Sequence, residues 1–271
     1  MTTGENPDAS SPFRFWAATM MMAFVHFARL LVRCGISFRI VKSRLEGDSM
    51  SQTEIDSFEQ LHRWIETHRG TTTIYRGVKD VSYELIPSVG RYNKKNDAAV
   101  ALKKEKYMLT LFKQQALPYL DAANRGPWEW MAIAQHHGMP TRLLDWTRNP
   151  LVAAFFAVTE AHDGDSLLYA YQNNRHINPE NEPDPFAVER VSRFVPSHIT
   201  PRITAQVGLF TIHPNPRDPF ESKEVTRGII KREFRKKLKK TLYKYGIHRA
   251  SLFPGLDGLC DHIKWLQTDT Y

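Results

Sequence analysis

One short stretch, Gln135–Ala157, combines many side chains that could do chemistry. Its sequence, QHHGMPTRLLDWTRNPLVAAFFA, holds two His, two Arg, two Thr, one Asp and one Trp and ends in an apolar run. Polar groups that are buried in such a setting cost free energy unless they are hydrogen-bonded. The stretch is therefore either a satisfied internal network or the wall of a binding site.

A second group that could do chemistry is Arg76, which follows a β-branched, aromatic run and precedes Gly77. A guanidinium group is a rigid fork that suits a phosphate or a carboxylate. We interpret Gly77 as leaving room for a ligand to approach the backbone. The alternative is that Arg76 pairs with a buried acid such as Asp145, and the residue types alone favour neither.

The two adjacent histidines, His136 and His137, lie near the end of a predicted helix, where neighbours point about 100° apart. They cannot chelate one metal ion from one helical face, and no Cys, His or Asp cluster has the spacing of a metal site. One of them could act as an acid, a base or a hydrogen-bond donor near neutral pH. Trp146 could stack on a base or a nicotinamide ring, although a Trp near helices more often belongs to the core.

Hydrophobic spacing and capping signals predict a single compact α+β domain with a small central sheet flanked by helices. The predicted helices are Ser51–His68 with a capping box at Ser51 and Glu54, Lys103–Leu120, Trp128–His137, one that begins at Asn149-Pro150, Lys231–Lys244 and a short C-terminal one. The predicted strands are Thr71–Val78, Thr141–Trp146, Ser166–Tyr171 and a long strand or strand pair over Arg202–His213, with an extended piece at Val81–Val89 and a loop over residues 173–190.

The positive charge of the chain is concentrated in one segment. Lys231–Lys244 holds eight basic residues and one Glu, a local charge of +7 out of a net +8. Ile230, Phe234, Leu238 and Leu242 recur every four residues beside it, which is typical of a helix with an apolar stripe and a basic opposite face. We interpret it as a surface helix docked on the core, with contact to nucleic acid or an acidic partner as the alternative.

The first fifty residues differ from the rest of the chain. Residues 1–12 are small and polar, and we predict a disordered leader. Residues 13–50 are apolar and basic, and we predict a helical segment that packs on the domain or a partner, or contacts a membrane surface through residues 13–40. Its apolar core, Phe15–Ala28, is shorter than a membrane span. With only Cys34 and Cys260, far apart, we expect a cytoplasmic protein.

Five segments, in order and spacing, resemble the FRG domain family, which is named for its (Phe/Tyr)-Arg-Gly motif. They are Tyr75–Gly77, Leu85–Ser88, Gln135–Thr147, Gln206–Thr211 and Leu252–Leu259. The resemblance covers residues 51–271 and implies one FRG domain there. The family occurs mostly in bacteria and phages, which implies an effector with a toxin or phage-defence role.

A weaker resemblance links the chain to Arg-Ser-Glu ADP-ribosyltransferases, in which an aromatic-Arg-Gly strand and a Ser/Thr strand end before an Asn-Pro helix form the NAD site. It implies that Arg76 binds the diphosphate or ribose of NAD and that Thr147 replaces the ordering Ser. It further implies that Tyr75, His136, His137, Arg142 and Trp146 contribute to binding NAD.

The third motif of those transferases is a Glu on a later strand, and this chain has Gln206 in the corresponding predicted strand. Gln can hydrogen-bond a hydroxyl group but carries no negative charge. Either Gln206 serves in a binding or altered role, or Asp145 supplies the carboxylate. Two functions stay open: an NAD-dependent ADP-ribosyltransferase or NAD glycohydrolase, and a non-enzymatic module that recognises nucleic acid or a protein through the cleft and the basic helix.

Overall fold

The computed structural model describes residues 52–92, 97–120, 125–196 and 200–268. Contacts divide the chain into Met1–Ser49 and Met50–Tyr271, and the description below concerns the second unit. The predictions for residues 1–12 and 13–50 therefore lie outside the described residues. Within those residues, no helix has the length and apolar character that crossing a membrane requires.

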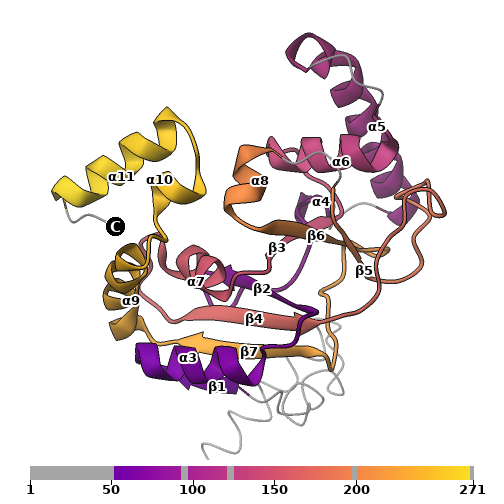
Figure 1. The fold of residues 1–271 in the computed structure, drawn as a ribbon. Coiled ribbons are helices and arrows are strands. Elements are labelled where there is room, and N and C mark those ends of the chain that lie inside the picture. The colour runs from indigo at the N-terminus through magenta and orange to yellow at the C-terminus, as the bar shows by residue number, and fades with distance from the viewer. Residues whose placement is uncertain (1–51, 93–96, 121–124, 197–199, 269–271) are drawn as a thin grey trace, which may run out of the picture. The chain divides into compact units, whose positions relative to one another are not determined.

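The described residues form an α+β domain around one sheet of seven strands (Figure 1). The order across the sheet is β1-β7-β4-β2-β3-β6-β5, so strands that are distant in sequence lie side by side. Only the pair β1 and β7 is parallel. The strands are β1 Gln52–Ile55, β2 Thr73–Val78, β3 Leu143–Thr147, β4 Ser166–Gln172, β5 Ser192–Phe194, β6 Gly208–Ile212 and β7 Val225–Ile230.

Helices pack against both halves of this sheet and build two of its three hydrophobic clusters. Helices α3, α7 and α9 pack with β1, β2, β4 and β7, whereas α5 and α6 pack with β3, β5 and β6. The bounds are α3 Phe58–Thr67, α4 Ser88–Tyr92, α5 Ala98–Ala116, η1 Leu117–Tyr119, α6 Pro127–His136, α7 Pro150–Val158, α8 Pro201–Ala205, α9 Arg232–Lys244, α10 Arg249–Leu252 and α11 Leu256–Thr268.

Helix α7 begins as its sequence predicts. The side chain of Asn149 accepts a hydrogen bond from the backbone N–H of Leu151, and Pro150 occupies the first turn, where it requires no N–H partner. The helix is almost entirely buried, and it packs on β2 at Gly77. A Cβ atom at Gly77 would lie 1.8 Å from the carbonyl oxygen of Ala153. Gly77 thus allows the α7 backbone to pack directly against β2. This corrects the interpretation that Gly77 leaves room for a ligand.

The basic segment forms helix α9 as predicted, and Phe234, Leu238 and Leu242 are buried on its apolar face. Ile230 does not belong to that helix because it ends strand β7. Arg235 and Lys239 are also buried: they donate to carbonyl groups of Ala157, Glu160, His162 and Thr159 at the end of α7. Cations at a helix C-terminus satisfy its unpaired carbonyls and complement its dipole.

Several predicted elements differ in the structure. Gln52–Ile55 is a strand rather than the start of a helix, and Ser57 caps α3 in place of Ser51. Val81–Val89, which Pro87 limits to an edge strand or a loop, is a turn and loop that enters α4. Arg202–His213 is not one strand: helix α8 comes first, and Gln206 is its C-cap. Strands β5 and β7 are present although no sequence pattern predicted them.

Candidate functional site

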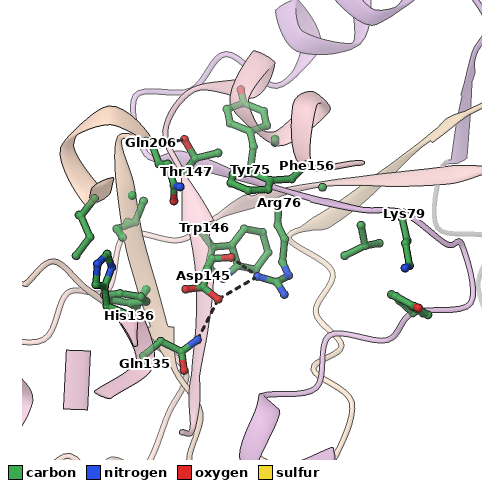
Figure 2. Close-up of a pocket in the computed structure, with 18 of the residues that line it drawn as sticks. Tyr75, Arg76, Lys79, Gln135, His136, Asp145, Trp146, Thr147, Phe156 and Gln206 are labelled. Carbon is green, nitrogen blue, oxygen red and sulfur yellow. Dashed lines mark hydrogen bonds and ion pairs between the residues drawn. The ribbon is translucent and has the colours of Figure 1, made fainter. Parts of the chain in front are cut away.

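The sheet splits between strands β2 and β3. Their register consists of one Cα pair, Tyr75 with Thr147, whereas β3 pairs with β6 over five residues and β2 with β4 over six. Beyond that pair the two strands diverge, and backbone groups along the split need other partners. The split places the side chain of Arg76 next to Asp145 (Figure 2).

Arg76 fills part of this split and keeps one side open to solvent. Its Nη1 donates to the backbone carbonyl of Asp145 at 2.5 Å and lies 3.7 Å from the Asp145 carboxylate. The side chain is 22% exposed, so it is not sealed in the core. Burial lowers the pKa of the Arg76 guanidinium, Asp145 opposes this shift, and Arg91 adds to it. An anion bound here would offset both the burial of the guanidinium and its repulsion by Arg91.

A cleft of about 1190 Å³ opens over the split. Ligand pockets span roughly 300–1,000 Å³, so this cleft has room for a dinucleotide. Among the described residues, its wall carries four Lys or Arg side chains and three carboxylates. The cations are Lys79, Arg76, Arg91 and Arg202, and the acids are Glu84, Asp145 and Glu160.

Asp145 belongs to a chain of hydrogen bonds that continues into α6. Gln135 donates to the Asp145 carboxylate at 3.0 Å and accepts from the hydroxyl of Thr141 at 2.7 Å. The Asp145 side chain is 60% exposed. It therefore presents an oriented carboxylate to the cleft, next to the guanidinium of Arg76 (Figure 2).

Thr147 and Gln206 line the same cleft, on the side away from Gln135 (Figure 2). The hydroxyl of Thr147 donates to the backbone carbonyl of Gln206 at 2.7 Å and accepts from the N–H of Asn149. The side-chain amide of Gln206 donates to the carbonyl of Leu252 at 3.0 Å. Thr147 therefore orders the turn before α7, whereas the Gln206 amide oxygen can still accept a hydrogen bond from a ligand hydroxyl.

The residue after Gln206, Val207, has a φ of 48°. A β-branched residue is strained at positive φ, at a cost of about 1–3 kcal/mol. The Val207 carbonyl accepts from the N–H of Arg148, and this bond ties the strained turn to the end of β3. Strain of this kind often accompanies functional sites.

The remaining predicted site residues fall into two sets. Tyr75, His136, His137 and Trp146 line the cleft. Tyr75 and Trp146 are almost wholly buried, and their polar atoms donate to His68 and Thr211. Arg142 does not line the cleft: it is buried and forms a bidentate ion pair with Glu105 at 2.9 and 2.7 Å.

Three cations of the cleft were absent from the sequence prediction: Lys79, Arg91 and Arg202. Burial lowers the pKa of Arg202, partly offset by Asp145, and its guanidinium stacks on Phe253 at 4.6 Å. Lys79 pairs with Glu160 at 2.7 Å across the rim. Lys79 could have been found from the sequence, since it stands three residues after Arg76. Arg91 and Arg202 carry no such signal, because they lie in short helices without a motif of their own. In the described part of the chain, no group of three or more His, Cys, Asp or Glu could hold a metal ion.

Comparison with known proteins supports the resemblance over the first three of the five motifs, Tyr75–Gly77, Leu85–Ser88 and Gln135–Thr147, while the last two motifs lie outside the matched residues. Residues 71–166 match the FRG domain family. The chain contains an FRG domain. The matched residues run from the start of β2 to the start of β4 and include Arg76, Gln135, Asp145 and Thr147, which form the split and the cleft wall. Neither the curated proteins nor the solved structures include a match to this chain.

Proposed function

We propose that the FRG domain binds NAD in this cleft and either transfers its ADP-ribose or hydrolyses it, as an effector of bacterial or phage origin. One observation carries the proposal: the guanidinium of Arg76 lies in the split of the sheet and opens into a cleft shared with Thr147 and Gln206. An arginine that is partly exposed, and whose ion pair with the Asp145 carboxylate is long at 3.7 Å, is suited to a diphosphate.

In the proposed reaction, the charge of each side chain determines its role. Arg76 holds the diphosphate, with Arg202 of α8 as a further cation of the cleft. The N-glycosidic bond to nicotinamide breaks, its electron pair leaves with the nicotinamide, and positive charge develops on the ribose. The carboxylate of Asp145, oriented by Gln135, stabilises this charge. Water or a target nucleophile then attacks the ribose and loses a proton.

NAD turnover tests this proposal. Purified protein is incubated with NAD and a cell lysate, and nicotinamide release, ADP-ribose labelling and the thermal shift with NAD are measured. We expect turnover and a rise in Tm, both lost in Arg76→Ala and kept in the matched control Arg69→Ala, whose side chain is 76% exposed just after α3. An absence of turnover together with an absence of any thermal shift would refute the proposal.

The exposed face of α9 supports a second candidate function, the binding of nucleic acid. Arg235 and Lys239 are buried, but five other basic side chains of the helix are exposed: Arg232, Lys236, Lys237, Lys240 and Lys244. Affinity for nucleic acid should fall steeply with salt, because each phosphate contact releases counterions. Reversal of Lys236, Lys237 and Lys240 to Glu should abolish binding, and an affinity that survives the reversal would exclude α9 as the contact.

A further inference from the structure

A second, smaller cavity of about 330 Å³ lies on the other side of α7. Phe155 lines this cavity, whereas its neighbour Phe156 lines the large cleft, and Glu160 is the one residue that both lining sets share. The rest of the wall comes from Thr159 and Ala161 after α7, from Ile247 and His248 before α10, and from α9, α10 and α11; none of these residues is a predicted site residue.

Aromatic rings dominate this wall. The imidazoles of His248 and His262 stack with their centroids 4.2 Å apart and their planes at 14°. Trp265 lies 6.0 Å from His262 and nearly parallel to it, and Tyr243 packs edge-on against Trp265 at 5.5 Å. Ring walls of this kind favour a flat ligand, since aromatic groups gain most from offset-stacked and edge-to-face contacts.

The charged groups of the wall are largely occupied within the protein. Arg249 pairs with Asp261 at 3.1 Å, and Lys239 donates to the carbonyl of Thr159 while its Nζ lies over the ring of Trp265. Glu160 pairs with Lys79. The cavity therefore offers no concentrated charge of either sign to a ligand.

Lys264 lines the wall without an ion pair among the described residues, and the imidazole of His262 is a further exception to this pairing. The residue is 8% exposed, and its Nδ1 is buried without a hydrogen-bond partner among the described residues. A buried polar atom in that state costs free energy, about 1–3 kcal/mol. His248 differs, because its Nδ1 accepts from the N–H of Ser251. Burial lowers the pKa of both rings, and for His248 the neighbouring His262 lowers it further, so both are neutral at pH 7.

We propose that this cavity is a second binding site, which takes one flat heteroaromatic ring such as a purine base and hydrogen-bonds it through the imidazole of His262. The volume lies at the lower end of the range for ligand pockets and suits one ring system rather than a dinucleotide. A purine edge carries donors and acceptors side by side, so it matches a neutral imidazole nitrogen in either tautomer. The site is independent of NAD binding in the large cleft.

The test uses adenine as the probe with the full chain. Binding is measured by titration calorimetry, and the site is located from the chemical shifts of the His248 and His262 rings after isotopic labelling of histidine. We expect saturable binding that shifts both ring signals. His262→Ala should weaken binding at least tenfold, while His62→Ala, an exposed histidine on α3, should leave it unchanged.

Two further variants separate this site from the large cleft. Arg76→Ala should keep adenine binding, because Arg76 lines the other cavity. His262→Gln guards against a folding defect, since the amide keeps a hydrogen-bonding group while losing the stacked ring, and it should retain part of the affinity. Binding that disappears in Arg76→Ala and persists in His262→Ala would overturn the proposal, and so would the absence of binding to a folded wild-type chain.

Discussion

Arg76 and Arg142 lie in the same part of the domain, yet their guanidinium groups have different surroundings. The Arg142 side chain is 4% exposed, and its Nε and Nη2 donate to Glu105, whose side chain is 5% exposed. Arg76 has a single short contact to a backbone carbonyl and a longer approach to a carboxylate. The first arginine is therefore suited to stability and the second to a ligand.

Asp145 is the residue on which the proposed chemistry depends. Asp145→Asn keeps the shape and the hydrogen bonds of the side chain but removes its negative charge. We expect nicotinamide release to fall by about 10²-fold, the size typical of losing one electrostatic contact in a transition state, with NAD affinity nearly unchanged. Asp163→Asn, at a fully exposed position, is the control. Equal losses of kcat and affinity would argue against a role in the chemical step.

The Glu105–Arg142 pair yields a prediction about stability. Glu105→Gln leaves a buried guanidinium without its counter-charge, and the free energy of unfolding should fall by about 3–5 kcal/mol. Urea denaturation measures it. The exposed pair Arg69–Glu66 provides the contrast, because Glu66→Gln should change stability by less than about 1 kcal/mol. A loss below that level for Glu105→Gln would mean that the pair is open to solvent.

At the scale of elements, the contact of α7 with β2 holds the two walls of the cleft in place. Gly77 permits it because the helix backbone occupies the space of a Cβ atom. The same helix receives Arg235 and Lys239 of α9 at its carboxyl end. In the Arg76-Gly77 dipeptide, a side chain that lines the cleft thus stands next to a glycine that packing requires.

Gly77→Ala tests this packing. A clash with backbone atoms cannot be relieved by a rotamer change, so we expect a loss of about 3 kcal/mol in the free energy of unfolding. Gly126→Ala, at a position with no heavy atom within 4 Å of the added carbon, should cost much less. Thermal unfolding of the two variants compares them, and equal Tm values would show that α7 can move away from β2.

For the whole molecule, the buried network behind the cleft predicts how stability depends on pH. His213 accepts or donates a hydrogen bond with Thr211 at 2.8 Å, and Thr211 accepts from Trp146. Burial lowers the pKa of His213 to about 3, with Arg76 and Arg142 acting in the same direction. The folded imidazole therefore stays neutral over a range in which the unfolded one is protonated.

The sign of the effect follows from proton uptake. Between pH 6.5 and about pH 3, the unfolded chain binds a proton at His213 that the folded chain does not, so the free energy of unfolding falls as the pH drops through this window. Each pKa unit corresponds to about 1.4 kcal/mol, which makes the total several kcal/mol. His213→Gln should flatten the profile of unfolding free energy against pH, measured with urea, and an unchanged slope in this variant would contradict the prediction.

The sequence predicted the elements whose signals are local. The capped, apolar helix α7, the strands β2, β3 and β4 and the amphipathic helix α9 follow from side-chain periodicity and from Asn149 and Pro150. Strands β1, β5 and β7 were not predicted from the sequence. Strand β5 is three residues long, and β1 and β7 pair with strands from distant parts of the chain. Short edge strands are decided by pairing rather than by propensity.

The candidate site also has a part that the sequence predicted and a part that it did not. Residue types and spacing alone identified the family and singled out Arg76, Asp145, Thr147 and Gln206, because the residue type determines the chemistry of a side chain. Their meeting in one cleft depends on the divergence of β2 from β3, and the exclusion of Arg142 depends on Glu105, 37 residues away. Burial and pairing are properties of contacts across the chain, so the tertiary structure alone decided which arginine faces the cleft and which one is paired in the core.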